Sequence, residues 1–148
     1  MKLVCVQVLK ENAHTQEWIK SWKKPVIKHG EMTKKGYMVE YPESFSLGSY
    51  FDISFFTYIN AHYGVEIQDF VQIGPHSSIL SHSTIDNKKG SIILKTNCKI
   101  GANSTIMPNV TIGENSVVAA HSFVNKNIPK NELWAGVPAK FKAQIPSL

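Results

Sequence analysis

The sequence contains no arginine, so its formal net charge of +5 comes entirely from sixteen lysines set against eleven carboxylates. Arginine favours bidentate contacts with phosphates and base edges, and its absence argues against a protein that reads nucleic-acid sequence. Dispersed lysines still attract a small polyanion such as a nucleotide cofactor. Eight lysines lie in the first 35 residues and none lies in residues 50–85, so the charge belongs to the ends of the chain.

Cysteines and long apolar runs are also scarce. Cys5 and Cys98 show no C-x-x-C spacing, so they predict neither a disulfide framework nor a zinc site, and both are interpreted as small apolar residues. No apolar run approaches the roughly 20 residues of a membrane span, and the first residues lack the apolar stretch and cleavage site of a signal peptide. These absences and the length of 148 residues predict one compact cytoplasmic domain without membrane insertion.

The central part of the chain is a six-residue repeat, in which an aliphatic residue opens each hexad and a small or β-branched residue takes the fifth position. A period of six suits neither an amphipathic helix nor an alternating hairpin, and it predicts short strands joined by tight corners, three hexads to a triangular coil. Extended backwards, the register puts Leu47, Ile53, Ile59 and Val65 at the fifth position. The hexads are IQDFVQ, IGPHSS and ILSHST from residue 67, and LKTNCK, IGANST, IMPNVT, IGENSV, VAAHSF and VNKNIP from residue 94.

The fourth position of the hexad marks the corners. Asparagine is enriched where a residue other than glycine adopts φ > 0, so we expect these asparagines to turn the chain between strands. His76, His82 and His121 occupy the same position, and a corner role is therefore one interpretation of each of them. The asparagines are Asn97, Asn103, Asn109, Asn115 and Asn127.

The stretch IGANSTIMPNVTIGENSVVAAHSFVNKNIPKNELWAGVPAK is similar, almost position by position, to the hexapeptide-repeat acyltransferases. The resemblance covers residues 45–140 and is strongest to the sugar O- and N-acetyltransferases, the group that contains galactoside and maltose acetyltransferases. It implies an all-β fold, a left-handed parallel β-helix in residues 45–129, with residues 1–44 as an N-terminal cap and connecting segment. Residues 130–148 would form a tail that contributes to the coenzyme A site. The resemblance also implies acetyl-CoA as acyl donor, no metal, and a homotrimer with each active site between two subunits.

The two hexad registers are out of step between Ile85 and Leu94, which lie nine residues apart where six are expected. The segment IDNKKGSII is therefore predicted to carry a three-residue bulge, and DNKKG is a strong turn signal. An insertion has to leave a stacked coil outward, and such loops mark the binding face. This insertion directly follows His82.

The segment before residue 45 has a different pattern. VCVQV predicts a short strand, and residues 15–25 predict a helix. Trp18 and Trp22 lie on one face of this helix, and we expect them to cap the open end of the β-helix. Residues 26–44 are expected to form a loop.

The resemblance places the catalytic histidine at His82, in ILSHST just before the extruded segment. An imidazole, with an unperturbed pKa near 6.5, is suited to removing the proton of an acceptor hydroxyl or amine as that group attacks a thioester. Coils of three hexads also predict one column of residues as a candidate groove, with His62 on the same corner and His76 on another. The column consists of Gly64, His82, Asn103 and His121.

LGSYFDISFFTYINAHYG resembles part of the sugar pocket of galactoside-type enzymes, and the resemblance assigns Asp52, Asn60 and His62 to the acceptor. His62 stands where related enzymes often have asparagine. Ser54 and Phe55 replace a glycine-containing corner, so the acceptor is expected to differ from a simple galactoside. The alternative is an ordinary coil with Asn60 on its surface.

For coenzyme A, the resemblance assigns small residues to the pantetheine arm and polar or basic residues to the phosphates and the adenine end. Trp134 packs on the adenine in this interpretation. The alternatives are a tight corner for the alanines and solvated charges for the lysines. The assigned residues are Ala102, Ala120, Asn125, Lys126, Trp134 and Lys140.

The predicted function is acetyl transfer to a hydroxyl or amino group of a sugar, either a nucleotide-linked sugar or a polysaccharide precursor. The first alternative is a β-helical trimer that serves as a non-catalytic scaffold, because a fold outlasts its activity in some proteins. The second is a zinc-dependent γ-type carbonic anhydrase, with His62, His82 and His121 as ligands on one corner. That enzyme places two of its histidines on one strand and corner, whereas His76 and His82 are predicted to point to different corners.

Overall fold

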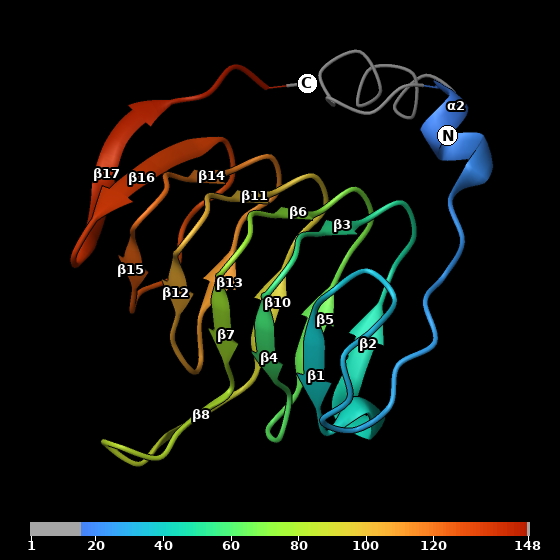
Figure 1. Cartoon of the computed structure of the whole chain (residues 1–148). Coiled ribbons are helices and arrows are strands. Elements are labelled where there is room, and N and C mark those ends of the chain that lie inside the picture. The colour runs from blue at the N-terminus through green and yellow to red at the C-terminus, as the bar shows by residue number, and fades with distance from the viewer. Residues whose placement is uncertain (1–15, 148) are drawn as a thin grey trace.

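Short parallel strands wind around one core and stack into three sheets (Figure 1). The computed structural model describes residues 16–147. The predicted parallel β-helix is confirmed, because strands of successive coils pair in parallel around the core. Within residues 16–147, only α2 (Gln16–Ser21) and the short 3-10 helix η1 (Pro42–Ser44) are helical. Neither of these helices has the length and apolar character needed to cross a membrane.

Strands of successive coils pair in parallel and build the three sheets, here named sheets A, B and C. A separate antiparallel hairpin, β8 (His82–Ser83) and β9 (Lys88–Lys89), leaves the coil after β7. Sheet A contains β1 (Met38–Glu40), β4 (Tyr58–Asn60), β7 (Ser78–Leu80), β12 (Thr105–Ile106) and β15 (Phe123–Val124). Sheet B contains β2 (Phe45–Leu47), β5 (Val65–Ile67), β10 (Ile92–Leu94) and β13 (Thr111–Ile112). Sheet C contains β3 (Asp52–Ile53), β6 (Gln72–Ile73), β11 (Lys99–Ile100), β14 (Val117–Val118), β16 (Glu132–Gly136) and the antiparallel β17 (Ala139–Gln144).

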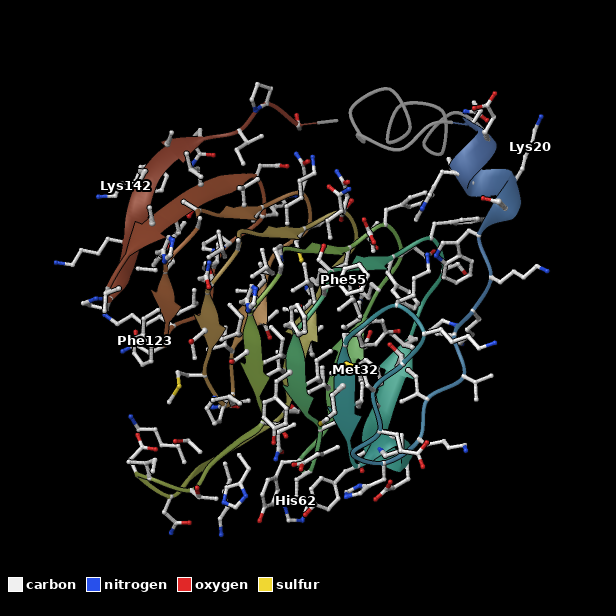
Figure 2. All side chains as sticks on the ribbon, in the orientation of Figure 1. Lys20, Met32, Phe55, His62, Phe123 and Lys142 are labelled. Atoms are coloured by element: carbon white, nitrogen blue, oxygen red, sulfur yellow. The ribbon has the colours of Figure 1, made fainter. Side chains whose placement is uncertain are left out.

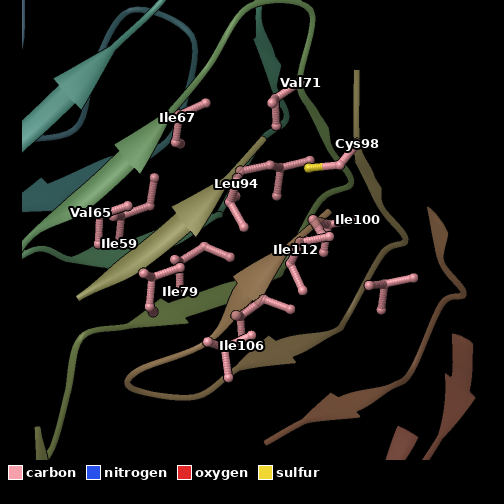
Figure 3. Packing of buried hydrophobic residues seen from close by; sticks show 14 of the residues in the cluster. Ile59, Val65, Ile67, Val71, Ile79, Leu94, Cys98, Ile100, Ile106 and Ile112 are labelled. Atoms are coloured by element: carbon pink, nitrogen blue, oxygen red, sulfur yellow. The ribbon is translucent and has the colours of Figure 1, made fainter. Parts of the chain in front are cut away.

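The aliphatic residues that open the hexads form the core. Ile79, Ile106 and Ile112 are fully buried, and Figure 3 shows such side chains gathered inside the coil. Burying one of them stabilises the fold by about 1.5–3 kcal/mol relative to leaving it exposed. Cys98, at a fifth position, is also fully buried, and burial raises the pKa of its thiol. Its interpretation as a small apolar residue is confirmed, whereas Cys5 lies outside the described residues.

The asparagine corners are confirmed at four of the five predicted positions, where φ lies between 56° and 65°. Asn97 Nδ2 also donates a hydrogen bond to Asn115 Oδ1 of the next coil at 3.1 Å, which ties these two corners together. Asn127 does not adopt a positive φ, and its Oδ1 instead accepts a hydrogen bond from the Thr111 N–H at 2.8 Å. The four corner residues are Asn97, Asn103, Asn109 and Asn115.

The histidines at the same hexad position do not behave alike. His76 and His121 have φ values of 59° and 58°, so the corner interpretation is confirmed for both. His82 is an extended residue of β8 that pairs with Lys89. The corner interpretation is therefore wrong for His82, and another reason must account for a histidine there.

The coils differ in length, and this corrects the predicted stacking. Tyr58 lies beside Ser78, so the coil from residue 58 to residue 78 takes twenty residues. Ser78 lies beside Thr105, which makes the next coil 27 residues long. Only the following coil, from Thr105 to Phe123, has the predicted eighteen residues.

The additional residues lie at one corner, between sheets A and B, which we call corner AB. The inward residues Ile59 and Ile67 are eight positions apart across this corner, whereas Ile106 and Ile112 are six apart. The backward extension of the hexads is wrong because of these two extra residues. Leu47 pairs with Ile67, a residue that opens a hexad rather than one at a fifth position.

The predicted three-residue bulge is in fact the whole hairpin β8–β9, which lengthens its coil by nine residues over an eighteen-residue one. Figure 1 shows this hairpin protruding at the lower left. The prediction is too small because it counts the extra residues from Ile85, which is not part of the coil. It lies in the hairpin turn and is 96% exposed.

The N-terminal cap packs on the first coil through Trp22. Its ring lies 5.2 Å from that of Phe51, and its Nε1 donates a hydrogen bond to the Phe51 carbonyl at 3.0 Å, which confirms the capping role of Trp22. α2 ends at Ser21, earlier than the helix predicted for residues 15–25. β1 lies within residues 26–44, which were expected to form a loop. The strand predicted for VCVQV falls outside the described residues.

Candidate active site

Three aromatic side chains meet at corner AB, where β4 and β7 end. The ring centroid of His82 lies 5.6 Å from that of His62 and 5.2 Å from that of Tyr63, and the last two are 4.6 Å apart. His62 is exposed and His82 is partly buried. Figure 2 shows His62 at the lower edge of the molecule, the edge from which the hairpin protrudes. A molecule that arrives from solvent at this corner reaches both imidazoles.

Side-chain hydrogen bonds hold the backbone of this corner. Asn60 Oδ1 accepts a hydrogen bond from the His62 N–H at 3.1 Å, and Ser81 Oγ accepts one from the Tyr63 N–H at 2.9 Å. Gly64 closes the turn with a φ of 97°, a conformation that favours glycine. The two aromatic residues at the tip of the turn are therefore held in place by their own backbone.

A carboxylate lies beside the corner on the outer face of sheet A. Glu40 Oε2 accepts hydrogen bonds from the Tyr58 hydroxyl at 2.7 Å and from Asn60 Nδ2 at 3.2 Å. Burial raises the pKa of Tyr58, and the hydrogen bond to Glu40 raises it further, so the phenol remains a donor at neutral pH. Asn60 uses both ends of its amide in these contacts, and it therefore positions His62.

Tyr41 extends the aromatic group toward the first coil. Its ring stacks on His62 with centroids 4.2 Å apart and an interplanar angle of 11°, and it meets His29 edge-on at 4.9 Å. His29 Nδ1 accepts a hydrogen bond from the Tyr41 N–H at 3.0 Å. Sequence reasoning missed Tyr41 and Tyr63. The sequence does contain a signal for this corner, namely the spacing of twenty residues between His62 and His82, which equals the length of that coil. With this coil length, Tyr41 and Tyr63 fall on the same corner as the two histidines.

The hairpin β8–β9 forms one wall of corner AB. His82 pairs with Lys89 across the hairpin, and Lys89 Nζ lies 5.7 Å from the Tyr63 ring centroid, a cation–π arrangement. Near the turn, Lys88 forms an ion pair with Asp86 at 2.9 Å. The hairpin therefore brings positive charge close to the two histidines.

A shallow groove of about 420 Å³ runs along the outer face of sheet C. Asp52 in the first coil and Ala120 in the fourth both line it. A Cβ atom at Gly101 would overlap the backbone of Ala120, and one at Gly74 would lie 2.6 Å from the backbone nitrogen of Ala102. The coils therefore stack this closely only because glycine occupies these positions, and their outer surface stays open to an extended ligand.

Residues 91–126, which run from the end of the hairpin through β15, match the bacterial transferase hexapeptide family, described as six repeats. The resemblance to hexapeptide-repeat transferases is confirmed over these residues. The repeat that defines the family is the one whose opening residues form the buried core.

Relatives of this hexapeptide-repeat chain include acetyltransferases. It is 38% identical over 122 residues to galactoside O-acetyltransferase of Escherichia coli, a match that covers 72% of this chain and 60% of the relative. The chain thus spans about three fifths of that relative. A hexapeptide-repeat acetyltransferase from Vibrio cholerae, solved with acetyl coenzyme A, has a TM-score of 0.70 at 28% identity, over 75% of this chain and 66% of that one. A mutant of AntD, an N-acyltransferase from Bacillus cereus solved with dTDP and coenzyme A, has a TM-score of 0.62 at 26% identity, over 75% and 72%.

The structure brings together two of the three residues assigned to the acceptor. Asn60 and His62 lie at corner AB beside His82. Asp52 lies in β3 of sheet C, beside Gln72, and lines the groove on that sheet. Within this chain, Asp52 is therefore separated from the other two residues.

The residues assigned to coenzyme A also fall into two groups. Ala102 and Ala120 lie at the corner that joins sheet C to sheet A, and the Trp134 carbonyl accepts a hydrogen bond from the Ala119 N–H at 2.9 Å at the C-terminal end of the groove. Trp134 Nε1 donates to Glu132 at 2.7 Å, and Lys140 is exposed on the neighbouring β17. The second group follows β15 at corner AB, at the other end of the sheet A strands, and both of its residues are exposed. It consists of Asn125 and Lys126.

The predicted column of Gly64, His82, Asn103 and His121 is wrong. The backbone N–H groups of Asn103 and His121 donate to the coils below them at the corner between sheets C and A, which puts both residues in one column with His76. His121 thus lies on a different corner from His62 and His82, and the three ligands expected for a carbonic anhydrase do not share a corner. Within residues 16–147, no three histidine, cysteine or acidic side chains form a group that would hold a metal ion.

Proposed function

We propose that this chain transfers an acetyl group from acetyl-CoA to a hydroxyl or amino group of a sugar, either nucleotide-linked or a polysaccharide precursor. The observation that carries the proposal is the meeting of His62, Tyr63 and His82 at corner AB, beside an extruded hairpin. The acetyltransferases among the relatives, one of them solved with acetyl coenzyme A, support it.

His82 acts as the general base. It takes the proton of the acceptor as the acceptor oxygen or nitrogen forms a bond to the thioester carbonyl carbon. The carbon–sulfur bond then breaks, and coenzyme A leaves as the thiol with the proton that the imidazole carried. His62 contacts the acceptor beside it, held by Asn60 and stacked on Tyr41.

Acetyl-CoA lies along the groove of sheet C, where Ala102 and Ala120 leave room for the pantetheine arm and Trp134 packs on the adenine. Lys140 lies at the adenine end. Asn125 and Lys126 are at the other end of the sheet A strands, so the two groups meet only if a second subunit supplies one of them.

A homotrimer satisfies this requirement by setting the groove of one subunit against corner AB of the next. It also brings Asp52, which lines the groove, to an acceptor bound at the neighbouring corner. The absence of lysine from residues 50–85 supports a buried subunit face in the middle of the chain. In this arrangement the tail, residues 130–148, completes the donor site.

Filling the groove tests the donor site. Acetyl-CoA at about 100 times its Kd stabilises the native protein by about 2.7 kcal/mol, which raises Tm by about 5–10 °C for a chain of this size. We expect Ala120→Phe to abolish this shift, because Ala120 is exposed and lines the groove. Differential scanning fluorimetry measures both values.

Ser46→Phe is the matched control, since Ser46 is exposed on the outer face of sheet B and a phenylalanine there adds the same bulk away from the groove. It should keep the full shift. A scaffold without a donor site predicts no shift in any of the three proteins, and an unchanged shift in Ala120→Phe would place the donor elsewhere.

A further inference from the structure

The N-terminal cap contains a second cavity, of about 490 Å³, between the segment after α2 and the segment before β1. This volume is within the range of small-molecule sites. We call it the lysine pocket, because five of its lining residues are lysines. They are Lys23, Lys24, Lys28, Lys34 and Lys35.

Both walls of the lysine pocket are tied to the β-helix. On one side, Lys24 Nζ donates a hydrogen bond to the Leu47 carbonyl at 3.1 Å, next to the Trp22 anchor. On the other side, residues 33–36 form a turn in which the Gly36 N–H donates to the Thr33 carbonyl at 2.9 Å. Thr33 Oγ1 also accepts a hydrogen bond from the Tyr37 N–H at 3.3 Å. The turn that carries Lys34 and Lys35 is therefore fixed before any ligand arrives.

The lining of the lysine pocket carries more positive than negative charge. Glu31 is the carboxylate among its lining residues, and it pairs with Lys28 at 3.6 Å. Lys23, Lys34 and Lys35 thus gather positive charge around one cavity, an arrangement that favours a bound polyanion.

Apolar side chains complete the lining. Val26 is 82% exposed and Met32 is 52% exposed, and both border the cavity beside Pro25. Exposed apolar surface rimmed by charge marks a binding site. A ligand that fits has phosphate groups for the lysines and a non-polar portion for these residues.

We propose that the lysine pocket binds a phosphoester with two or more phosphate groups and a non-polar portion. Two sources share this chemistry, namely a soluble diphosphate ester and the headgroup of a lipid that carries two phosphates. The five lysines are separate from the residues assigned to acetyl-CoA and to His82, so the proposal does not depend on acetyl transfer.

Pyrophosphate is the first probe, measured by isothermal titration calorimetry with the full chain in the presence of excess acetyl-CoA. We expect the double variant Lys34→Gln/Lys35→Gln to weaken binding by about tenfold or more, because each ammonium forms a charge-assisted contact with phosphate. The matched control, Lys88→Gln/Lys95→Gln, removes the same charge from exposed sites of the β-helix outside the donor site and should change Kd by less than about twofold. Equal weakening in both variants would overturn the proposal.

Vesicles distinguish the two sources. Co-sedimentation with vesicles that contain cardiolipin, a lipid with two phosphates in its headgroup, but not with phosphatidylcholine vesicles, assigns the pocket to a lipid headgroup if Lys34→Gln/Lys35→Gln abolishes it. Pyrophosphate binding without vesicle binding assigns it to a soluble ester. Binding of neither probe rejects the proposal. The acetyl-CoA melting shift should be unchanged in the same variant, and its loss would merge the pocket with the donor site and contradict the inference.

Discussion

Replacing His82 with alanine is expected to lower kcat by about 10²- to 10⁴-fold, the contribution of a positioned general base. The imidazole sits at corner AB within 6 Å of His62 and Tyr63, where an acceptor can enter from solvent. Loss of the ring removes the group that takes the acceptor proton, while the core and the groove on sheet C are untouched. Steady-state release of the coenzyme A thiol measures kcat, and the acetyl-CoA melting shift should stay as in the unsubstituted protein.

Asparagine substitutions separate the base from a corner residue. His76 has a φ of 59° and stacks on Phe56, so asparagine, which tolerates that conformation, should replace it with kcat within about twofold. His82→Asn should instead be as impaired as His82→Ala, because His82 lies in an extended strand and asparagine cannot take up a proton. Full activity of His82→Asn would refute the base assignment and point to an amine acceptor that loses its proton to water.

Replacing Ile106 with alanine should lower the free energy of unfolding by about 2–5 kcal/mol per chain. Ile106 is fully buried, with Ile79 and Val124 paired beside it in the coils on either side. Its removal leaves a cavity that two stacked neighbours cannot fill without shifting their own strands. Urea unfolding at one fixed protein concentration measures the loss, since an oligomer makes apparent stability depend on concentration.

Thr105→Ala is the matched control for Ile106→Ala. Thr105 is the adjacent residue of the same strand, β12, and its side chain lies on the outer face of sheet A. It should cost less than about 1 kcal/mol, within the range of cross-strand contacts on a sheet surface. Equal losses at the two positions would show that burial of the opening hexad residues does not hold the fold together.

The fold was predictable because burial in a β-helix repeats with the same period as the sequence. Every coil needs one aliphatic residue facing inward per side, so Ile100, Ile106 and Ile112, one from each sheet, reveal the three sides without any tertiary information. Asparagine at the fourth position marks the tight corners for a backbone reason, the positive φ of residues such as Asn103 and Asn109. Both patterns depend only on residues close together in the sequence, so a single sequence is enough to detect them.

The lengths of the corners were not predictable in the same way. Additional residues at a corner leave the pattern of inward residues intact in the strands on both sides of it. In the sequence, a coil of twenty residues therefore appears only as a change of hexad register, which does not show how long the corner is. The hairpin that begins at His82 therefore looks like a three-residue bulge when residues are counted from Ile85, which is in fact exposed in the hairpin turn. One consequence was the wrong column, in which His121 was placed with His82 although it lies at another corner.

The candidate site was predicted in its chemistry and only partly in its geometry. His62 and His82 meet as expected, whereas Asp52 lies on another sheet. Tyr41 and Tyr63 were missed because an aromatic residue in a strand or corner has many structural explanations. Only the stacking across twenty-residue coils shows that their rings contact the histidines.

Acetyl transfer itself is tested most directly by incubating the full chain with acetyl-CoA and a panel of nucleotide-linked hydroxy and amino sugars. Free thiol and acetylated sugar are then quantified together. The account predicts that at least one acceptor releases thiol mole for mole with acetylated product, and that His82→Asn loses this turnover. No thiol release with any acceptor, together with no acetyl-CoA melting shift, would contradict the account and leave a non-catalytic scaffold.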